Sequence, residues 1–565
     1  MPSSRISRRI PSSSAKMRVA MTLRTLGFAV ACWFLFAVAP EAQERHDHPA
    51  SPSLKLGTVH FPNSGKPAAQ EPFLRGVALL HSFEYDEAAE QFRAAQKLDP
   101  SFAMAYWGEA LTNIHPLWGE DDPVAARAAL ARLGATRDAR IAKAPTPRER
   151  AYGGAVEALF ANAEMPARAR GFADGMRQVV KAFPNDPEAA AFTSLALMFV
   201  AGWGELQTDE RRQASGDAVT FAERVFREDP EHPGGAHYLI HATDNPELAP
   251  RGLTAARRYA EIAPDAEHAL HMPSHIFVQL GLWHDVVASN ERAWAASRSE
   301  IVARKLPNTE LSFHSLQWLQ YGYLQAGRYK DARQTITTAR EVLSGIDLAR
   351  ASSSDARYTV GFLEFQQAAN TGDWSGPICD RTLAAQPEGV NESEREKSFR
   401  AQTAYQTVIA AVKCGRGTDV VAAARKRVET GRSDDYAMVA LKRALQHADL
   451  LTYMAGSPSQ NLERLLADPE PSPAPVGPPT TLRVHELLGD ARIKAGRIPG
   501  AVAAYEQGLQ LTPNRSTTLL GLARARVAAG DERAAADAYR KLLENWRHAD
   551  ADLSALAEVR TGAAR

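Results

Sequence analysis

The chain has 565 residues, of which 45% are hydrophobic and 23% are charged, and its formal net charge is zero. This length exceeds that of one ordinary globular core and favours several domains or a repeat array. The apolar content excludes a disordered chain, and the neutral balance gives no sign of the basic surface that nucleic-acid binding requires. We therefore expect an ordered protein without a nucleic-acid partner.

The first 42 residues have the features of a secretory signal peptide. Six basic residues precede an apolar run over residues 26–39, which ends in a small-x-small sequence. The translation start and the cleavage point stay open. The run is too short for a membrane span, and no other stretch is long and apolar enough for one. We expect an exported protein, periplasmic or secreted, with no membrane span in the mature chain.

A helical repeat pattern begins after a segment rich in Pro, Ser and Gly, which we expect to be a flexible linker. Gly76, Ala88, Phe92 and Pro100 occupy positions 8, 20, 24 and 32 of the 34-residue tetratricopeptide repeat. Small side chains at positions 8 and 20 let two antiparallel helices approach closely, and the aromatic ring at position 24 fills the space toward the next unit.

The C-terminal end repeats this pattern. Gly489, Ala501, Tyr505 and Pro513 occupy the same four positions, and the pattern returns 34 residues later. The two agreements predict an all-α fold, a right-handed α-solenoid of the tetratricopeptide-repeat type built from antiparallel helix pairs. The expected organisation in chain order is signal peptide (1–42), flexible linker (43–68), main solenoid (69–467), Pro-rich linker (468–480) and C-terminal repeat pair with cap (481–565).

Histidines are concentrated in one part of the chain, because eight of the sixteen lie between His232 and His314. Spacings of three and four residues keep side chains on one face of a helix. In the repeat register, histidines of five units face the concave groove, whereas His232 and His284 do not. The expected groove residues are His81, His115, Trp118, His237, His241, Asp244, His268, His271, His275, Gln279, His314, Gln317 and Tyr321.

Three hypotheses for this cluster stay open. The leading one is a scaffold that binds a protein or peptide partner in the groove, with imidazoles as hydrogen-bond donors. The alternative is a metalloprotein, metal-handling or catalytic, because imidazoles four residues apart on one helix can share a zinc, copper or iron ion. The third is a packed polar network with the function elsewhere. The candidate metal ligands are His237, His241, His268, His271, His275 and His314.

One geometric criterion separates the first two hypotheses. A metal site needs three or four imidazoles to converge, with acceptors on their other ring nitrogens. A peptide groove needs them spread along the solenoid with apolar pockets between them. The sequence does not decide whether the chain is an enzyme.

Three sequence blocks resemble a family of large exported bacterial tetratricopeptide-repeat proteins. The blocks are AMAYWGEAL (103–111), HYLIHA (237–242) and HALHMPSHIFVQLGLWHD (268–285). The His-Met-Pro-Ser-His sequence is the most specific part of the resemblance, which spans roughly residues 70–335. The resemblance implies a helical scaffold and leaves the activity open.

Two local questions remain open in the sequence. Pro273 lies within the densest histidine block, where it either occupies the first turn of a helix or kinks one. Cys379 and Cys414 are the cysteines that remain after the signal peptide. An exported chain could pair them, but their spacing in the sequence does not show that they meet.

Overall fold

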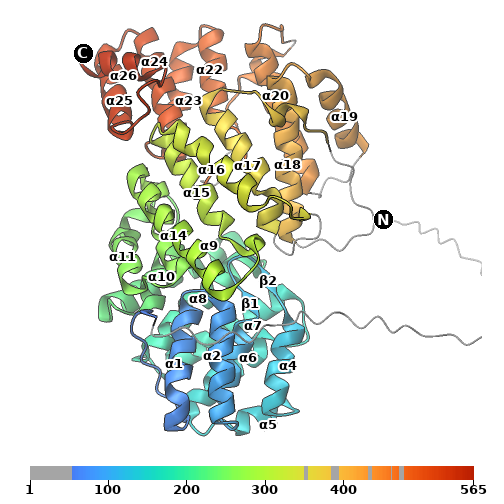
Figure 1. Cartoon of the computed structure of the whole chain (residues 1–565), viewed down its shortest axis with the longest axis vertical. Helices are drawn as coiled ribbons and strands as arrows, with labels where there is room; N and C mark the ends of the chain where they lie inside the picture. The colour runs from blue at the N-terminus through green and yellow to red at the C-terminus, as the bar shows by residue number, and fades with distance from the viewer. Residues whose placement is uncertain (1–53, 349–353, 384–393, 431–435, 460, 470–475) are drawn as a thin grey trace, which may run out of the picture. The chain divides into compact units, whose positions relative to one another are not determined.

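The computed structural model (Figure 1) describes residues 54–348, 354–383, 394–430, 436–459, 461–469 and 476–565. The expected signal peptide lies outside these residues. The described chain is mainly helical, and its one sheet is the antiparallel pair of β1 (Ile114–His115) and β2 (Glu120–Asp121). Among the described helices, none combines the length and the apolar character that a bilayer crossing needs.

Fourteen α-helices follow one another through the described first part of the chain. They are α1 (Pro67–His81), α2 (Tyr85–Leu98), α3 (Ala103–Leu111), α4 (Pro123–Leu133), α5 (Arg137–Ala142), α6 (Pro147–Leu159), α7 (Met165–Ala182), α8 (Pro187–Trp203), α9 (Thr208–Glu228), α10 (Pro233–Ala242), α11 (Ala249–Ile262), α12 (Glu267–His271), α13 (Pro273–Leu280) and α14 (Trp283–Arg304).

The series continues to the C-terminus. The remaining helices are η1 (Asn308–Glu310), α15 (Phe313–Gln325), α16 (Tyr329–Val342), α17 (Ser354–Thr371), η3 (Pro377–Asp380), α18 (Glu394–Lys413), α19 (Gly417–Thr430), α20 (Tyr436–Met454), α21 (Leu462–Leu465), α22 (Val484–Lys494), α23 (Ile498–Leu511), α24 (Ser516–Ala528), α25 (Glu532–Asn545) and α26 (Leu556–Ala563). Neighbours in sequence pack against each other, for example α1 on α2, α8 on α9 and α24 on α25 (Figure 1).

Glycines packed against aromatic rings set the close approach of paired helices. A Cβ atom added to Gly76 would lie 2.9 Å from the ring of Phe92, and one added to Gly108 in the next unit would lie 2.3 Å from the same ring. Gly489 and Tyr505 repeat this contact near the C-terminus, at 2.4 Å. Gly76 with Phe92, and Gly489 with Tyr505, occupy positions 8 and 24 of the repeat, so the predicted tetratricopeptide-type α-solenoid is confirmed.

The described part of the expected flexible linker (43–68) is packed against the helices. In residues 54–66, Phe61 is buried. Its ring centroid lies 5.5 Å from that of Trp107 and 5.2 Å from that of Tyr152. An aromatic side chain in such contacts ties its segment to the core. Residues 54–66 therefore differ from the flexible segment that we expected.

Helices on the two sides of the Pro-rich linker share a hydrophobic core. Leu487 of α22 and Ala504 of α23 share a hydrophobic core with Tyr405 of α18. The indole nitrogen of Trp283 also donates to the backbone oxygen of Asn514 at 2.8 Å. Helices after the Pro-rich segment thus pack onto helices before it. Within that segment, residues 470–475 lie outside the described part of the chain.

The structure answers the question about the cysteines. A disulfide joins Cys379 of η3 to Cys414, the residue after the end of α18, and the two Cα atoms are 5.8 Å apart. The spacing of the two cysteines in the sequence could not show this, because the tertiary packing of η3 against α18 brings them together. The bond closes a loop with a sequence separation of 35 residues.

Candidate metal centre

Four helices bring together the six histidines that were the candidate metal ligands. Helix α10 carries His237 and His241, α12 carries His268 and His271, α13 carries His275, and α15 carries His314. A spacing of four residues places the first two side chains one above the other on α10. The helices converge so that the six imidazoles form two triads, each with ring nitrogens within 4.8 Å of one another.

Pro273 explains how the densest histidine block folds. It is the first residue of α13, and Met272 before it keeps right-handed helical angles, with φ −54° and ψ −35°. Proline is tolerated at this position because the first turn needs no N–H donor. Of the two possibilities left by the sequence, the structure shows the first-turn position. His271 and His275 lie on either side of this junction and still point toward each other.

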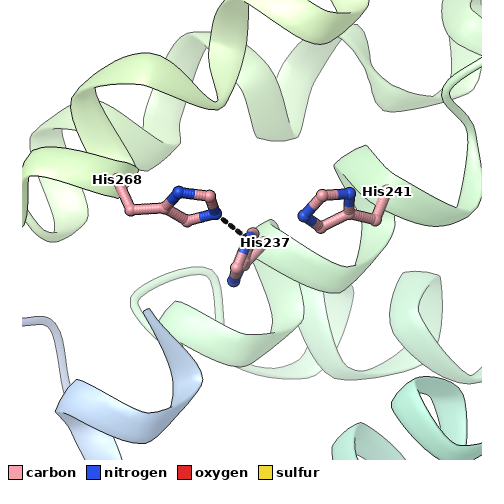
Figure 2. A group of neighbouring side chains, drawn as sticks. All are labelled: His237, His241 and His268. Carbon is pink, nitrogen blue, oxygen red and sulfur yellow. Dashed lines mark hydrogen bonds between the residues drawn. The ribbon is translucent and has the colours of Figure 1, made fainter. Parts of the chain in front are cut away.

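The first triad consists of His237, His241 and His268 (Figure 2). The Nε2 atoms of His237 and His268 are 3.1 Å apart. Nδ1 of His237 lies 2.6 Å from the backbone oxygen of His81. A carbonyl oxygen only accepts, so the neutral His237 ring carries its proton on Nδ1 and keeps a lone pair on Nε2. Nε2 of His241 is buried and has no hydrogen-bond partner among the described residues.

The second triad consists of His271, His275 and His314. Nδ1 of His271 lies 2.7 Å from Oδ1 of Asn290, whose amide nitrogen donates to a carbonyl of its own helix and so fixes the oxygen toward the imidazole. Nδ1 of His275 lies 2.6 Å from Oδ2 of Asp244. In its neutral form each ring therefore carries the proton on Nδ1. Their Nε2 lone pairs face each other at 3.2 Å.

Facing lone pairs at this distance repel each other unless a proton or a cation lies between them. A tetrahedral ion bound at about 2.0–2.1 Å from two imidazole nitrogens holds those nitrogens roughly 3.3 Å apart. The separations of 3.1 Å in the first triad and 3.2 Å in the second are close to this value. The ring arrangement thus has the dimensions of a ligand set.

Burial keeps five of these six imidazoles neutral. Loss of water around the ring lowers the pKa of His237 and of His314 to about 3. The same cause, reinforced by neighbouring imidazoles, lowers the pKa of the remaining three affected rings, which are His241, His268 and His271. A histidine binds a metal ion through its neutral form. These rings are therefore in the ligating state at neutral pH.

Groups around the triads hold the rings in place. Oδ1 of Asp244 accepts a hydrogen bond from Nε2 of Gln279 at 2.9 Å, which leaves the other carboxylate oxygen to His275. The ring of Trp318 packs 4.3 Å from the ring of His275. Trp118 lies near the first triad, 6.1 Å from His268. A carboxylate on the outer nitrogen of an imidazole is the usual arrangement around metal-ligating histidines.

His81 lies outside both triads, which corrects the expected groove. Its Nε2 atom is 2.8 Å from Oε2 of Glu188, and His232, which the register placed away from the groove, is 3.2 Å from Oε1 of the same carboxylate. The other ring nitrogens are also bonded, to Tyr238 and to the N–H of Gly235. All three side chains are fully buried. Although their spacing would allow a metal ion, this cluster is a satisfied hydrogen-bond network.

Three further expected groove residues bond elsewhere. Nε2 of Gln317 donates to the hydroxyl of Thr359 at 2.8 Å. The hydroxyl of Tyr321 accepts from Arg515 at 2.9 Å. His115 stacks on a tyrosine ring with centroids 4.1 Å apart. The structure thus gathers six histidines with Asp244, Gln279 and Trp118 and does not spread all the expected residues along one groove.

Sequence reasoning missed several residues that hold buried histidines in place. Asn290 and Glu188 lie on helices that the repeat register does not assign to the groove, so no spacing signal pointed to them. Trp318 follows His314 by four residues on α15. This spacing could have identified it as a neighbour of the second triad.

Comparisons with known proteins do not identify a ligand for this chain. No family model matches the sequence, and no curated protein matches it. Among solved structures, the human IFIT1 dimer with m7Gppp-AAAA is 12% identical over 85% of this chain and 91% of that chain, with a TM-score of 0.28. The P58(IPK) TPR domain is 13% identical over 87% and 96%, with a TM-score of 0.20. These scores carry no inference about function.

The class of the protein therefore follows from its own helices: it is an all-α solenoid of the tetratricopeptide-repeat type. Within this class, the distinctive feature of the chain is the pair of histidine triads.

Proposed function

We propose that this chain is a metalloprotein whose two histidine triads bind transition-metal ions. The observation that carries the proposal is the pair of Nε2 atoms of His271 and His275, which face each other at 3.2 Å while both outer nitrogens are bonded to acceptors. Burial lowers the pKa of His271 and so opposes a proton on that ring. A metal ion coordinated by both nitrogens satisfies them without protonation.

The donor set favours particular metals. Both triads consist of imidazoles alone. Neutral imidazoles suit zinc, copper and iron, and copper(II) binds most tightly among the divalent ions of this series. A tetrahedral ion needs four ligands, so three histidines leave at least one position for water or a substrate. An open position is typical of catalytic and metal-handling sites, whereas structural zinc sites are closed by four protein ligands.

The convergence of the imidazoles supports the metal hypothesis over a peptide groove. A peptide groove would require the rings to lie apart along the solenoid with apolar pockets between them. Instead, the second triad brings together the rings of His271, His275 and His314, which lie on three different helices. For this cluster we therefore propose the metalloprotein, which was the alternative from the sequence; a protein or peptide partner for the solenoid stays a prediction.

We also propose that the protein acts outside the cytoplasm, in the periplasm or as a secreted protein. The signal-peptide features of residues 1–42 support this, and so does the Cys379–Cys414 disulfide, since such bonds persist mainly in oxidising compartments.

Elemental analysis of the purified chain, produced without a histidine tag, tests the proposal. The wild type is compared with the double variant His271→Ala/His275→Ala and with His60→Ala, which removes an exposed imidazole outside the triads. We expect bound metal at near-integer stoichiometry in the wild type and in the control, and a loss of the second-triad ion in the double variant. Circular dichroism shows whether the double variant is folded.

Two results would refute the metal proposal. One is a wild-type chain that binds no metal even after reconstitution with zinc, copper and iron. The other is a folded double variant that retains all of its metal.

A further inference from the structure

We infer that the two triads form one dinuclear centre, whose two ions share a small oxygen-donor anion, hydroxide in the resting protein. This inference rests on the proposed metal-binding function and adds to it the nuclearity of the centre and the class of ligand that it takes.

The first argument is the distance between the triads. The ring centroids of His241 and His275, which belong to different triads, are 5.6 Å apart, and those of His268 and His271 are 6.2 Å apart. Within the triads the separations reach similar values, 6.2 Å for His241 and His268 and 6.4 Å for His275 and His314. The six rings are therefore one continuous cluster, with no layer of other side chains between its halves at these contacts.

The second argument is a buried ring nitrogen without a hydrogen-bond partner in the described part of the chain. His241 joins the two triads, because its ring lies 4.8 Å from that of His237 and 5.6 Å from that of His275. Its Nε2 atom is buried without a hydrogen-bond partner among the described residues. Leaving a buried nitrogen without a hydrogen bond costs on the order of 1–3 kcal/mol, so coordination of a metal ion by this nitrogen is favoured.

The third argument is charge. Six neutral imidazoles contribute no negative charge to two divalent ions. Among the described residues that bond a ring of either triad, Asp244 is the carboxylate. Two dications in a buried site repel each other strongly because the effective dielectric constant there is low. An anion placed between them reduces this repulsion and can fill the coordination position that each triad leaves open.

Access for such an anion comes from the solvent side of the cluster. His241, His268 and His314 are partly exposed, whereas His237, His271 and His275 are buried. The exposed edges belong to both triads. Each triad thus has at least one partly exposed ring beside which a small anion can enter.

Electron paramagnetic resonance of the copper-loaded chain tests the inference. The metal-free full-length protein is loaded with copper(II), copper is counted by elemental analysis, and the spins are integrated before and after denaturation in acid. We expect two coppers per chain, loss of most of the spin signal in the folded protein through coupling across the bridge, and its return to two spins after denaturation. Sodium azide, a small anion used as a probe, should bind with one anion per two coppers.

Single-triad variants supply the matched controls. His237→Ala weakens the first triad and His314→Ala weakens the second, so each variant should hold one copper with a full, uncoupled spin. Two coppers with two independent spins in the wild type, or one azide per copper, would overturn the dinuclear inference and leave the metal proposal intact. A chain that binds no copper, zinc or iron would instead overturn the proposed function itself.

Discussion

Replacing Asp244 with asparagine perturbs the metal centre without touching a ligand. The carboxylate is 7% exposed, and its two oxygens accept from His275 at 2.6 Å and from Gln279 at 2.9 Å. Asparagine keeps the size of the side chain but turns one acceptor into an NH₂ group. Gln279 can rotate its own amide to accommodate this change. The negative charge that orients the imidazole and raises its basicity is lost.

The expected magnitude follows from the role of such outer partners. Removing a hydrogen-bond partner of a metal-ligating histidine typically lowers metal affinity by 10–100-fold, which corresponds to about 1.4–2.7 kcal/mol. We expect the dissociation constant of the second-triad ion to rise by this factor in Asp244→Asn. The fold should be preserved, because both hydrogen bonds can be remade with an amide.

Competition with a coloured chelator measures the change in affinity. Asp285→Asn is the matched control, since it removes an exposed carboxylate from the first turn of α14, away from the imidazoles. The control should bind metal as the wild type does. If Asp244→Asn binds as tightly as the wild type while His271→Ala/His275→Ala loses its ion, the assigned role of the carboxylate is wrong.

Three further predictions concern stability. Glu188→Gln should lower the free energy of unfolding in urea by about 3 kcal/mol, because it removes the anion from a buried pair; a loss below about 1 kcal/mol would contradict this. His237 and His314 have a pKa of about 3 in the fold but about 6.5 unfolded, so the metal-free chain should keep its stability above about pH 6.5 and lose about 2 kcal/mol per histidine by pH 5. Equal urea midpoints at pH 7.5 and 5 would refute this. Cys379→Ser should cost about 4 kcal/mol by opening its loop, measured as a lower melting temperature than that of the oxidised wild type; equal melting temperatures would exclude it.

The solenoid could be predicted from the sequence because its contacts are local and repeated. Gly76 and Phe92 are sixteen residues apart, and their contact within a helix pair follows from the repeat alone. The same register correctly grouped the six candidate ligands, since five of them lie on helices that directly follow one another from α10 to α13. The repeat pattern therefore predicts contacts between residues that are close in the sequence.

The remaining features depend on packing between distant helices. His81 is the last residue of α1, and its ring bonds to Glu188 of α8, 107 residues away. A repeat position cannot specify which helix packs against that end. The hydrogen bond between Asn290 and His271 was not predicted either. The repeat assigns the helix that carries Asn290 to the outer layer of the solenoid.

The bond between the His237 ring and the backbone of His81 spans 156 residues of sequence. Contacts of such long range form late in folding, because the chain must lose much of its freedom before they stabilise it. A fragment from α10 to α15 would contain all six histidines and would still lack the carbonyl that orients one of them. The ligand arrangement is thus complete only when the N-terminal helices are docked, so the centre depends on the whole N-terminal half of the solenoid.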